Sequence, residues 1–127
     1  MPGKYLYEFA VIRVVPRVER EEFQNIGVIV YCKRARYLKA KYTLNEQKLV
    51  PFLGDLPIED VRKNIEAFDH ICAGDKQSGK VSEWDKADRF RWLTAVKSSS
   101  IQTSRPHIGY SDDLDETLDR IFKEQVL

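Results

Sequence analysis

Long hydrophobic runs are absent from this 127-residue sequence, and so is any strong excess of one charge. No apolar run approaches the roughly 20 residues that a helix needs to cross a bilayer. The opening "MPGKYLYEF" also lacks the cationic-then-apolar order of a signal peptide. We therefore expect no membrane association and a cytoplasmic location.

Cysteine and histidine are also scarce, with two of each in the chain. Cys32 and Cys72 lie outside any CxxC or Cys/His motif, which favours buried free thiols over metal ligands. His70 and His107 lack the acid or cysteine neighbours of a zinc site. The acids of "EREE" at 19–22 are typical of a solvated turn. The sequence therefore predicts no metal and no other cofactor.

Apolar and charged residues are present in the proportions of a folded domain. Hydrophobic residues make up 43% of the chain and aromatic residues 11%, whereas disordered chains lack aromatics and carry a large net charge. A chain of this length can bury a continuous core without disulfides or a metal. We expect residues 1–127 to form a single domain.

The net charge of +1 conceals an uneven distribution of charge. Residues 1–49 hold ten Lys/Arg against five Asp/Glu, and residues 50–127 hold eleven against fifteen. Much of the positive excess lies in "KRARYLKAK", at Lys33, Arg34, Arg36, Lys39 and Lys41. Such a patch can face phosphates, but a solvated hairpin explains it as well.

Four stretches have the pattern of β-strands. Residues 5–16 are apolar on both alternating faces, which predicts a central strand covered on both sides, and residues 25–32 form a second buried strand. Residues 37–43 alternate lysine with apolar or aromatic residues, which predicts a half-exposed strand in a hairpin with the second. β-Branched residues favour a strand or extended edge within 98–104.

Three stretches have helical spacing. One begins at Asp55 or Leu56 and ends near Cys72, with a proline near its first helical position. A second follows Ser82 and contains apolar residues up to 93, and a third is capped by Ser111 or Asp112. The predicted fold is therefore α+β, with an antiparallel sheet of three or four strands packed by about three helices.

Two stretches of the chain match motifs of one known family. "EEFQNIGVIVYC" carries Asn25 and Gly27 before the second strand, and "RFRWLTAVKSSSIQTSRPHIG" carries an Arg-Phe-x-Trp-Leu helix from Arg89 to Leu93. The later motif, with its His-x-Gly ending, is matched by Ser98, Ile101, Gln102, Ser104, His107 and Gly109. With these motifs the chain resembles, over nearly its whole length, the bacterial family called domain of unknown function 3037.

The sequence departs from the pattern of that family at two positions. Lys97 stands where arginine is usual, and Ser99 stands where threonine is usual. A bidentate anion clamp at position 97 is therefore not expected, because lysine is a point charge. Members of the family are often encoded beside kinases that resemble the HipA persistence toxin. The resemblance thus implies a small accessory or antitoxin-like protein that binds such a kinase.

The stretch "KSSSIQTSRPHIGYSDD" at residues 97–113 has more hydrogen-bonding groups than a loop requires. Asn25 and Gly27 fit either a turn or a β-bulge. Taking the turn, we expect residues 97–109 to run extended beside 25–27, so that their polar groups meet in one cleft. The predicted ligand- or partner-binding residues are Asn25, Arg89, Lys97, Ser98, Ser99, Gln102, Ser104, Arg105 and His107. No serine lies in a GxSxG elbow, so we assign no catalytic residue.

Three functions remain as hypotheses for this cleft and for the basic stretch. The first is a non-catalytic protein that binds and modulates a neighbouring HipA-like kinase. The second is an enzyme or binder acting on nucleotides or nucleic acid, in which Lys97 and Arg105 hold the phosphate and His107 is the acid or base. His107 also fits a histidine that bonds the backbone of a turn. The third is a nucleic-acid binder that uses residues 33–41, although no aromatic row separates its cations.

Overall fold

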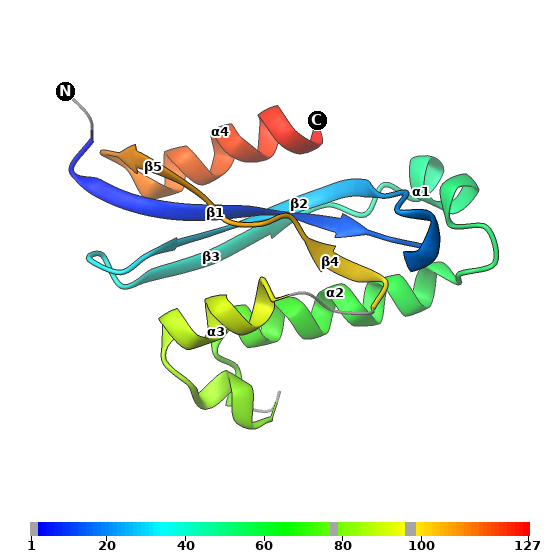
Figure 1. Ribbon diagram of the computed structural model, residues 1–127, viewed down its shortest axis with the longest axis horizontal. Helices are drawn as coiled ribbons and strands as arrows, with labels where there is room; N and C mark the ends of the chain where they lie inside the picture. The colour runs from blue at the N-terminus through cyan, green and yellow to red at the C-terminus, as the bar shows by residue number, and fades with distance from the viewer. Residues whose placement is uncertain (1–2, 77–78, 96–98) are drawn as a thin grey trace.

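A computed structural model describes residues 3–76, 79–95 and 99–127 of the chain. In this part the protein has a five-stranded antiparallel sheet with helices on both faces (Figure 1). The strands are β1 (Tyr5–Val14), β2 (Gln24–Cys32), β3 (Tyr37–Tyr42), β4 (Ile101–Thr103) and β5 (His107–Ser111). The α-helices are α1 (Glu46–Leu53), α2 (Ile58–Ala73), α3 (Lys86–Leu93) and α4 (Leu114–Val126), and the 3-10 helices are η1 (Val18–Arg20) and η3 (Lys80–Glu83).

The predicted α+β fold with an antiparallel sheet is confirmed. The sheet has the order β3-β2-β1, and both β4 and β5 pair with the remaining side of β1. β4 pairs with Ile12–Val14 and β5 with Tyr5–Phe9, so the two short strands form one interrupted strand along this side. Two elements were not predicted: β5, because Gly109 weakens the strand pattern of "HIGYS", and α1, because it contains Pro51.

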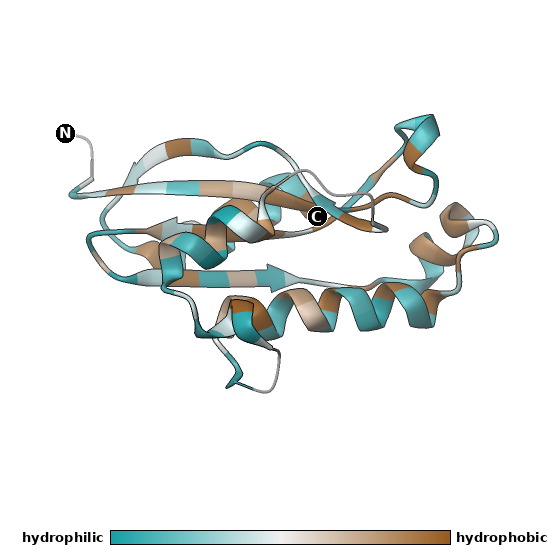
Figure 2. Ribbon diagram, turned by 60° about the horizontal axis from the view of Figure 1, so that its bottom comes forward, coloured by the Kyte–Doolittle hydropathy of each residue, from teal (hydrophilic) through white to brown (hydrophobic). Residues whose placement is uncertain are grey.

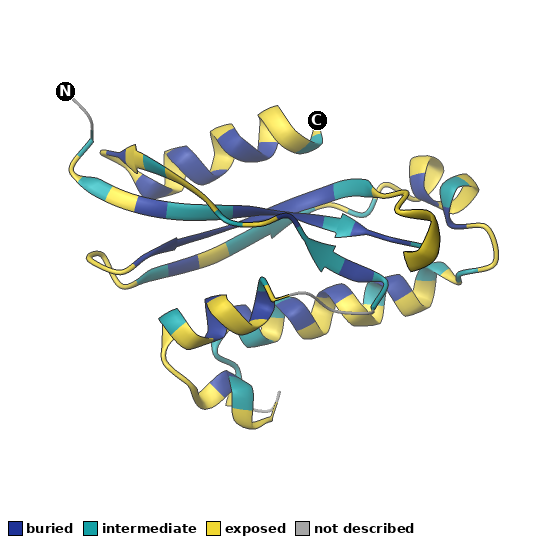
Figure 3. Ribbon diagram, viewed as in Figure 1, coloured by how far each residue is buried: buried dark blue, intermediate teal, exposed yellow. Residues whose placement is uncertain are grey.

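The two faces of β1 contact different helices, as its apolar pattern predicts. Ala10, Ile12 and Val14 belong to a core shared with α2, whereas Tyr7 and Val11 belong to a core shared with α4. β1 and β2 are accordingly buried along much of their length, while the outer sides of the helices are exposed (Figure 3). Along these helices hydrophobic residues alternate with hydrophilic ones (Figure 2). The central strand is therefore covered on both sides.

The helix starts follow local capping chemistry, and two predicted caps were wrong by one to three residues. α3 begins after Asp85, whose carboxylate accepts a hydrogen bond from the Asp88 N–H, while Ser82 donates to the Gly79 carbonyl within η3. α4 is capped by Asp113. An N-cap carboxylate accepts a hydrogen bond from the backbone N–H of the residue three positions later. It thereby satisfies one of the free N–H groups in the first turn of the helix. None of the helices in the described ranges is long and apolar enough to span a bilayer.

Candidate functional site

The serines and glutamine after α3 bond the backbone of their own segment. Ser99 Oγ donates to the Ile101 carbonyl at 2.7 Å and accepts from the Ile101 N–H at 3.1 Å. Gln102 Nε2 donates to the Ser99 carbonyl at 2.9 Å. These bonds hold the entry into β4 in shape, which accounts for part of the density of polar groups in this stretch.

Ser104 joins β4 to β5. Its N–H donates to the Val11 carbonyl at 2.9 Å, and its Oγ accepts from the Val11 N–H at 2.9 Å. The same hydroxyl donates to the Arg105 carbonyl at 3.0 Å. Ser104 lies opposite Val11 and His107 lies opposite Phe9, so both Arg105 and Pro106 lie opposite Ala10 and this extra residue interrupts the ladder until β5 begins. Ser104 thus replaces a backbone partner where the edge strand is interrupted.

Asn25 and Gly27 lie inside β2 and do not form the expected turn. Ile12 pairs with Gly27 but Arg13 pairs with Asn25, so Ile26 is an extra residue and β2 has a bulge there. A Cβ on Gly27 would lie 2.5 Å from the Lys41 carbonyl oxygen, which explains the glycine. β1 therefore separates Asn25 from the polar segment, and the single cleft expected from the sequence is not formed in that way.

Two of the predicted residues nevertheless meet at Arg13, which was not among the predicted site residues. Asn25 in β2 and Gln102 in β4 are both register partners of Arg13, one on each side of β1. Side chains that are directly opposite in a ladder project from the same face of the sheet. A single cation within the otherwise apolar end of β1 was the available signal in the sequence.

The Arg13 guanidinium lies in a partly apolar setting. Its Cζ lies 4.0 Å from the centre of the Phe23 ring, and its Nε is buried without a hydrogen-bond partner, as is Asn25 Oδ1. Burial lowers the pKa of Arg13, and no ion pair to Arg13 is found among the described residues. A cavity of about 400 Å³ adjoins it, lined by Arg13, Val15, Val18, Glu21, Glu22, Phe23, Gln102 and Thr103.

Arg89 lies on the other side of the sheet and acts within the fold. It is buried, and its guanidinium donates to the Trp84 carbonyl at 2.7 Å and to the Cys72 carbonyl at 3.5 Å. Cys72 is in the last turn of α2, where free carbonyls favour a cation. Arg89 therefore ties the end of α2 to the segment before α3. Burial raises the pKa of the nearby Cys72 thiol to about 12.

The remaining predicted residues do not join the Arg13 site. His107 is exposed and its ring lies 5.3 Å from that of Phe9, four residues along β1 from Arg13. Arg105 is exposed. Lys97 and Ser98 lie outside the described residues. In the described ranges no three His, Cys, Asp or Glu side chains are grouped so that they could hold a metal ion.

The basic stretch at 33–41 is partly neutralised by α4. Lys39 Nζ lies 3.1 Å from Asp115 and Lys41 Nζ lies 2.9 Å from Asp119. The Tyr37 hydroxyl donates to the same Asp115 carboxylate at 2.7 Å, and burial together with this bond raises the Tyr37 pKa. These cations therefore hold β3 against α4.

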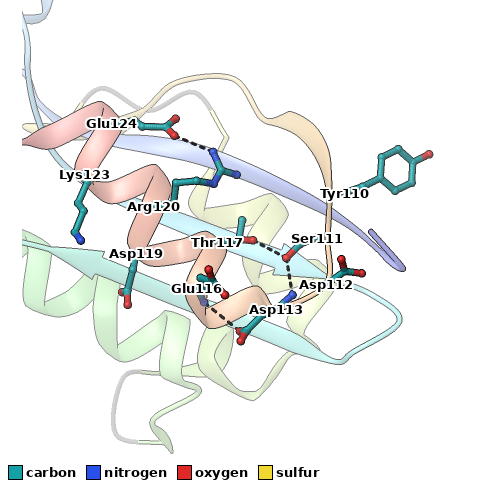
Figure 4. Close-up of a pocket in the computed structure, with 10 residues that line it drawn as sticks. All are labelled: Tyr110, Ser111, Asp112, Asp113, Glu116, Thr117, Asp119, Arg120, Lys123 and Glu124. Carbon is teal, nitrogen blue, oxygen red and sulfur yellow. Dashed lines mark hydrogen bonds and ion pairs between the residues drawn. The ribbon is translucent and has the colours of Figure 1, made fainter. Parts of the chain in front are cut away.

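A second open cavity, of about 700 Å³, lies between the end of β5 and the exposed side of α4 (Figure 4). Its lining residues are Tyr110, Ser111, Asp112, Asp113, Glu116, Thr117, Asp119, Arg120, Lys123 and Glu124. Five of these are carboxylates and two are cations. One cation, Arg120, is paired with Glu124 at 2.9 Å. The cavity is therefore acidic.

Three apolar side chains next to this cavity are exposed on the other face of the sheet. Leu6 and Tyr110 are register partners, and Ile108 is the residue two before Tyr110 in β5. Their exposed fractions are 72% for Ile108, 57% for Tyr110 and 50% for Leu6. We call these three residues the β5 apolar patch.

A family model described as "Protein of unknown function (DUF3037)" matches residues 9–126. A search of curated proteins and a search of solved structures each returned no match. The matched range begins within β1 and ends at the last residue of α4, so it includes the whole sheet except the start of β1. The chain belongs to the DUF3037 family.

Proposed function

We propose that this protein is a non-catalytic binding partner of another protein, and that the β5 apolar patch is its contact surface. The observation that carries the proposal is the exposure of Ile108 and Tyr110, at 72% and 57%, on a strand at the edge of the sheet. Grouped apolar side chains on a folded surface are typical of protein interfaces, and tyrosine is enriched in them. An edge strand adds unpaired backbone groups to that surface.

The contacts of the polar segment support a role in binding over one in catalysis. The hydroxyls of Ser99 and Ser104 are both engaged with backbone groups, so neither is poised beside a general base. His107 packs on Phe9 and lies on the opposite face from the side chains of Ile108 and Tyr110.

We take the partner to be a bacterial HipA-like kinase encoded beside this gene, in a cytoplasmic toxin–antitoxin-like pair. The support is that genes for members of the family are often found beside genes for such kinases. An accessory protein that modulates a kinase needs a stable contact surface and no active site of its own. The β5 apolar patch meets that requirement.

The test is a binding measurement between this protein and the neighbouring kinase, with and without nucleotide. Ile108→Ser and Tyr110→Ser should each weaken the affinity by about tenfold or more, because central interface residues commonly contribute that much. Val50→Ser is the matched control, since Val50 is another exposed apolar side chain, at 50%, but lies on α1. Equal affinity of the parent, the β5 variants and the control would rule out this surface.

A second candidate function is the binding of a phosphate-bearing ligand, such as a nucleotide, at Arg13. The favouring observation is a partly buried guanidinium that stacks on Phe23 and has no carboxylate partner among the described residues. Arginine presents a planar set of donors that suits phosphate oxygens. Glu21 and Glu22 also line the cavity, so the ligand would have to fit close to two carboxylates.

A further inference from the structure

We infer that β5 takes up an extended segment of the partner as an additional strand of the sheet, and that this segment alternates apolar residues with lysine or arginine. The inference rests on the proposed function and adds the form and the chemistry of the bound segment. The backbone of β5, the lack of protecting residues at this edge and the side chains on its two faces support it.

The backbone groups of Ile108 and Tyr110 face the free edge. Successive residues of a strand direct their N–H and C=O groups to opposite sides. The backbone groups of Val11 and Val15 form hydrogen bonds toward β4, so the odd-numbered residues of β1 direct their N–H and C=O groups to the β4 and β5 side. Their register partners in β5 are His107, Gly109 and Ser111. Ile108 and Tyr110 therefore direct their N–H and C=O groups away from β1, where an incoming strand can bond them.

β5 lacks the features that protect the edge strand on the other side of the sheet. β3 carries Lys39 and Lys41, and both lysines are held by α4. Charged side chains, especially lysine, discourage pairing with another strand. β5 has the sequence "HIGYS", without lysine, acid or proline. It is therefore the edge of this sheet that is open to strand addition.

The side chains on the two faces of β5 set the pattern of the incoming strand. Residues that project toward the β5 apolar patch meet Ile108 and Tyr110, so apolar residues fit there. Residues that project to the other face approach the acidic cavity, where Asp112 and Glu116 lie near the N-terminal end of α4 (Figure 4). Lysine or arginine fits that face. Strand residues alternate between faces, so the segment alternates in the same way.

The protein already contains this arrangement within its own fold. β3 alternates Leu38 and Ala40 with Lys39 and Lys41, and its lysines pair with Asp115 and Asp119 on the other flank of α4. The same helix therefore accepts lysines from a strand on one flank. Asp119 also lines the acidic cavity but is already paired with Lys41, and Glu124 is paired with Arg120, so Asp112 and Glu116 are the carboxylates that the cavity offers to a strand added at β5.

A second copy of this chain is a poorer occupant of the edge. Two β5 strands paired about a twofold axis would form one continuous sheet with both α4 helices on the same face. The acidic cavities of the two copies would then lie close together and repel each other. Neither β5 strand supplies lysine or arginine to offset that repulsion. The partner strand is therefore expected to come from another protein.

The experiment uses the full chain and three synthetic peptides. The first alternates leucine and lysine, the second alternates leucine and glutamate, and the third is the first with N-methyl groups on the edge-facing amides. We expect the leucine–lysine peptide to bind about tenfold tighter or more than the other two. Hydrogen exchange measured by NMR should slow at the Ile108 and Tyr110 amides when it binds. Binding without slower exchange at these two amides would overturn the inference.

Charge-reversal variants distinguish binding at the acidic cavity from a general attraction between the protein and a basic peptide. Glu116→Lys should weaken binding of the leucine–lysine peptide, whereas Glu66→Lys on the outer side of α2 should not, although both replace an exposed acid. An equal effect of the two variants would contradict the predicted pattern. If the kinase binds through Ile108 and Tyr110 while no peptide slows exchange in β5, the proposed function stands and strand addition is wrong. If the peptide protects β5 but the kinase does not bind, the edge site stands and the partner is wrong.

Discussion

At the scale of single residues, Arg13 is the best-defined candidate for binding a small anion. Arg13→Gln should weaken binding of pyrophosphate or a nucleotide by about tenfold or more, because a charge-assisted hydrogen bond is lost. Arg13→Lys should restore only part of the affinity, since lysine cannot bind two oxygens in one plane. Calorimetric titration measures these affinities. Arg17→Gln is the control, because Arg17 is exposed and lies 4.0 Å from Asp55. An equal loss in Arg13→Gln and Arg17→Gln, with no loss in Arg13→Lys, would show that only general charge matters.

Arg13 and Gly27 show which residue roles could be predicted from the sequence. The pattern of β1 predicts that it is a strand, but not that Asn25 and Gln102 become neighbours of Arg13, because that depends on which strands flank it. Gly27 was predicted to lie at a turn or a bulge. The structure shows a bulge, and the close approach of the Lys41 carbonyl explains why the residue is glycine. Both features arise from pairing between strands.

At the scale of elements, local periodicity was sufficient for β1, β2, β3, α2 and α4, whose apolar residues recur over many positions. It was insufficient for β5, which is short and whose Gly109 makes room for the Tyr7 ring. A strand of this kind is defined by its partner. The candidate site was predicted only in part for the same reason, since Arg89 was assigned to it but bonds the end of α2.

The contact between β3 and α4 should depend on pH through Asp115. Hydrogen bonds from Tyr37 and Lys39 lower the pKa of Asp115 in the folded protein. A carboxylate whose pKa is lower when folded stabilises the fold above its unfolded pKa of about 3.9, and this contribution is lost as the pH falls through the folded pKa. Asp115→Asn should therefore lower the melting temperature at pH 7, and the difference from the parent should shrink toward pH 2. Glu66→Gln is the control, and a difference that is constant with pH would contradict the assignment.

At the scale of the whole molecule, the basic first part of the chain and the acidic second part neutralise each other across the fold. Lys39 and Lys41 of the first part pair with Asp115 and Asp119 of the second. In a further pair the cation comes from the second part, since Arg91 lies 2.7 Å from Glu8. The excess of positive charge in residues 1–49 is thus partly neutralised by carboxylates of the same chain. The sequence alone could not show this, because the pairs join residues more than 70 positions apart.

This arrangement predicts weak binding to nucleic acids and a way to increase it. In fluorescence anisotropy at low salt, the parent protein should bind short DNA and RNA weakly, because two of the five cations in residues 33–41 already have carboxylate partners. The double variant Asp115→Asn with Asp119→Asn frees both lysines and should bind more tightly, with a steeper loss of affinity as salt increases. Glu59→Gln with Asp60→Gln on α2 makes the same change in net charge away from β3 and serves as the control.

Tight, salt-dependent binding by the parent would favour the nucleic-acid hypothesis instead. An equal gain in both double variants would mean that net charge, and not the release of Lys39 and Lys41, governs the interaction.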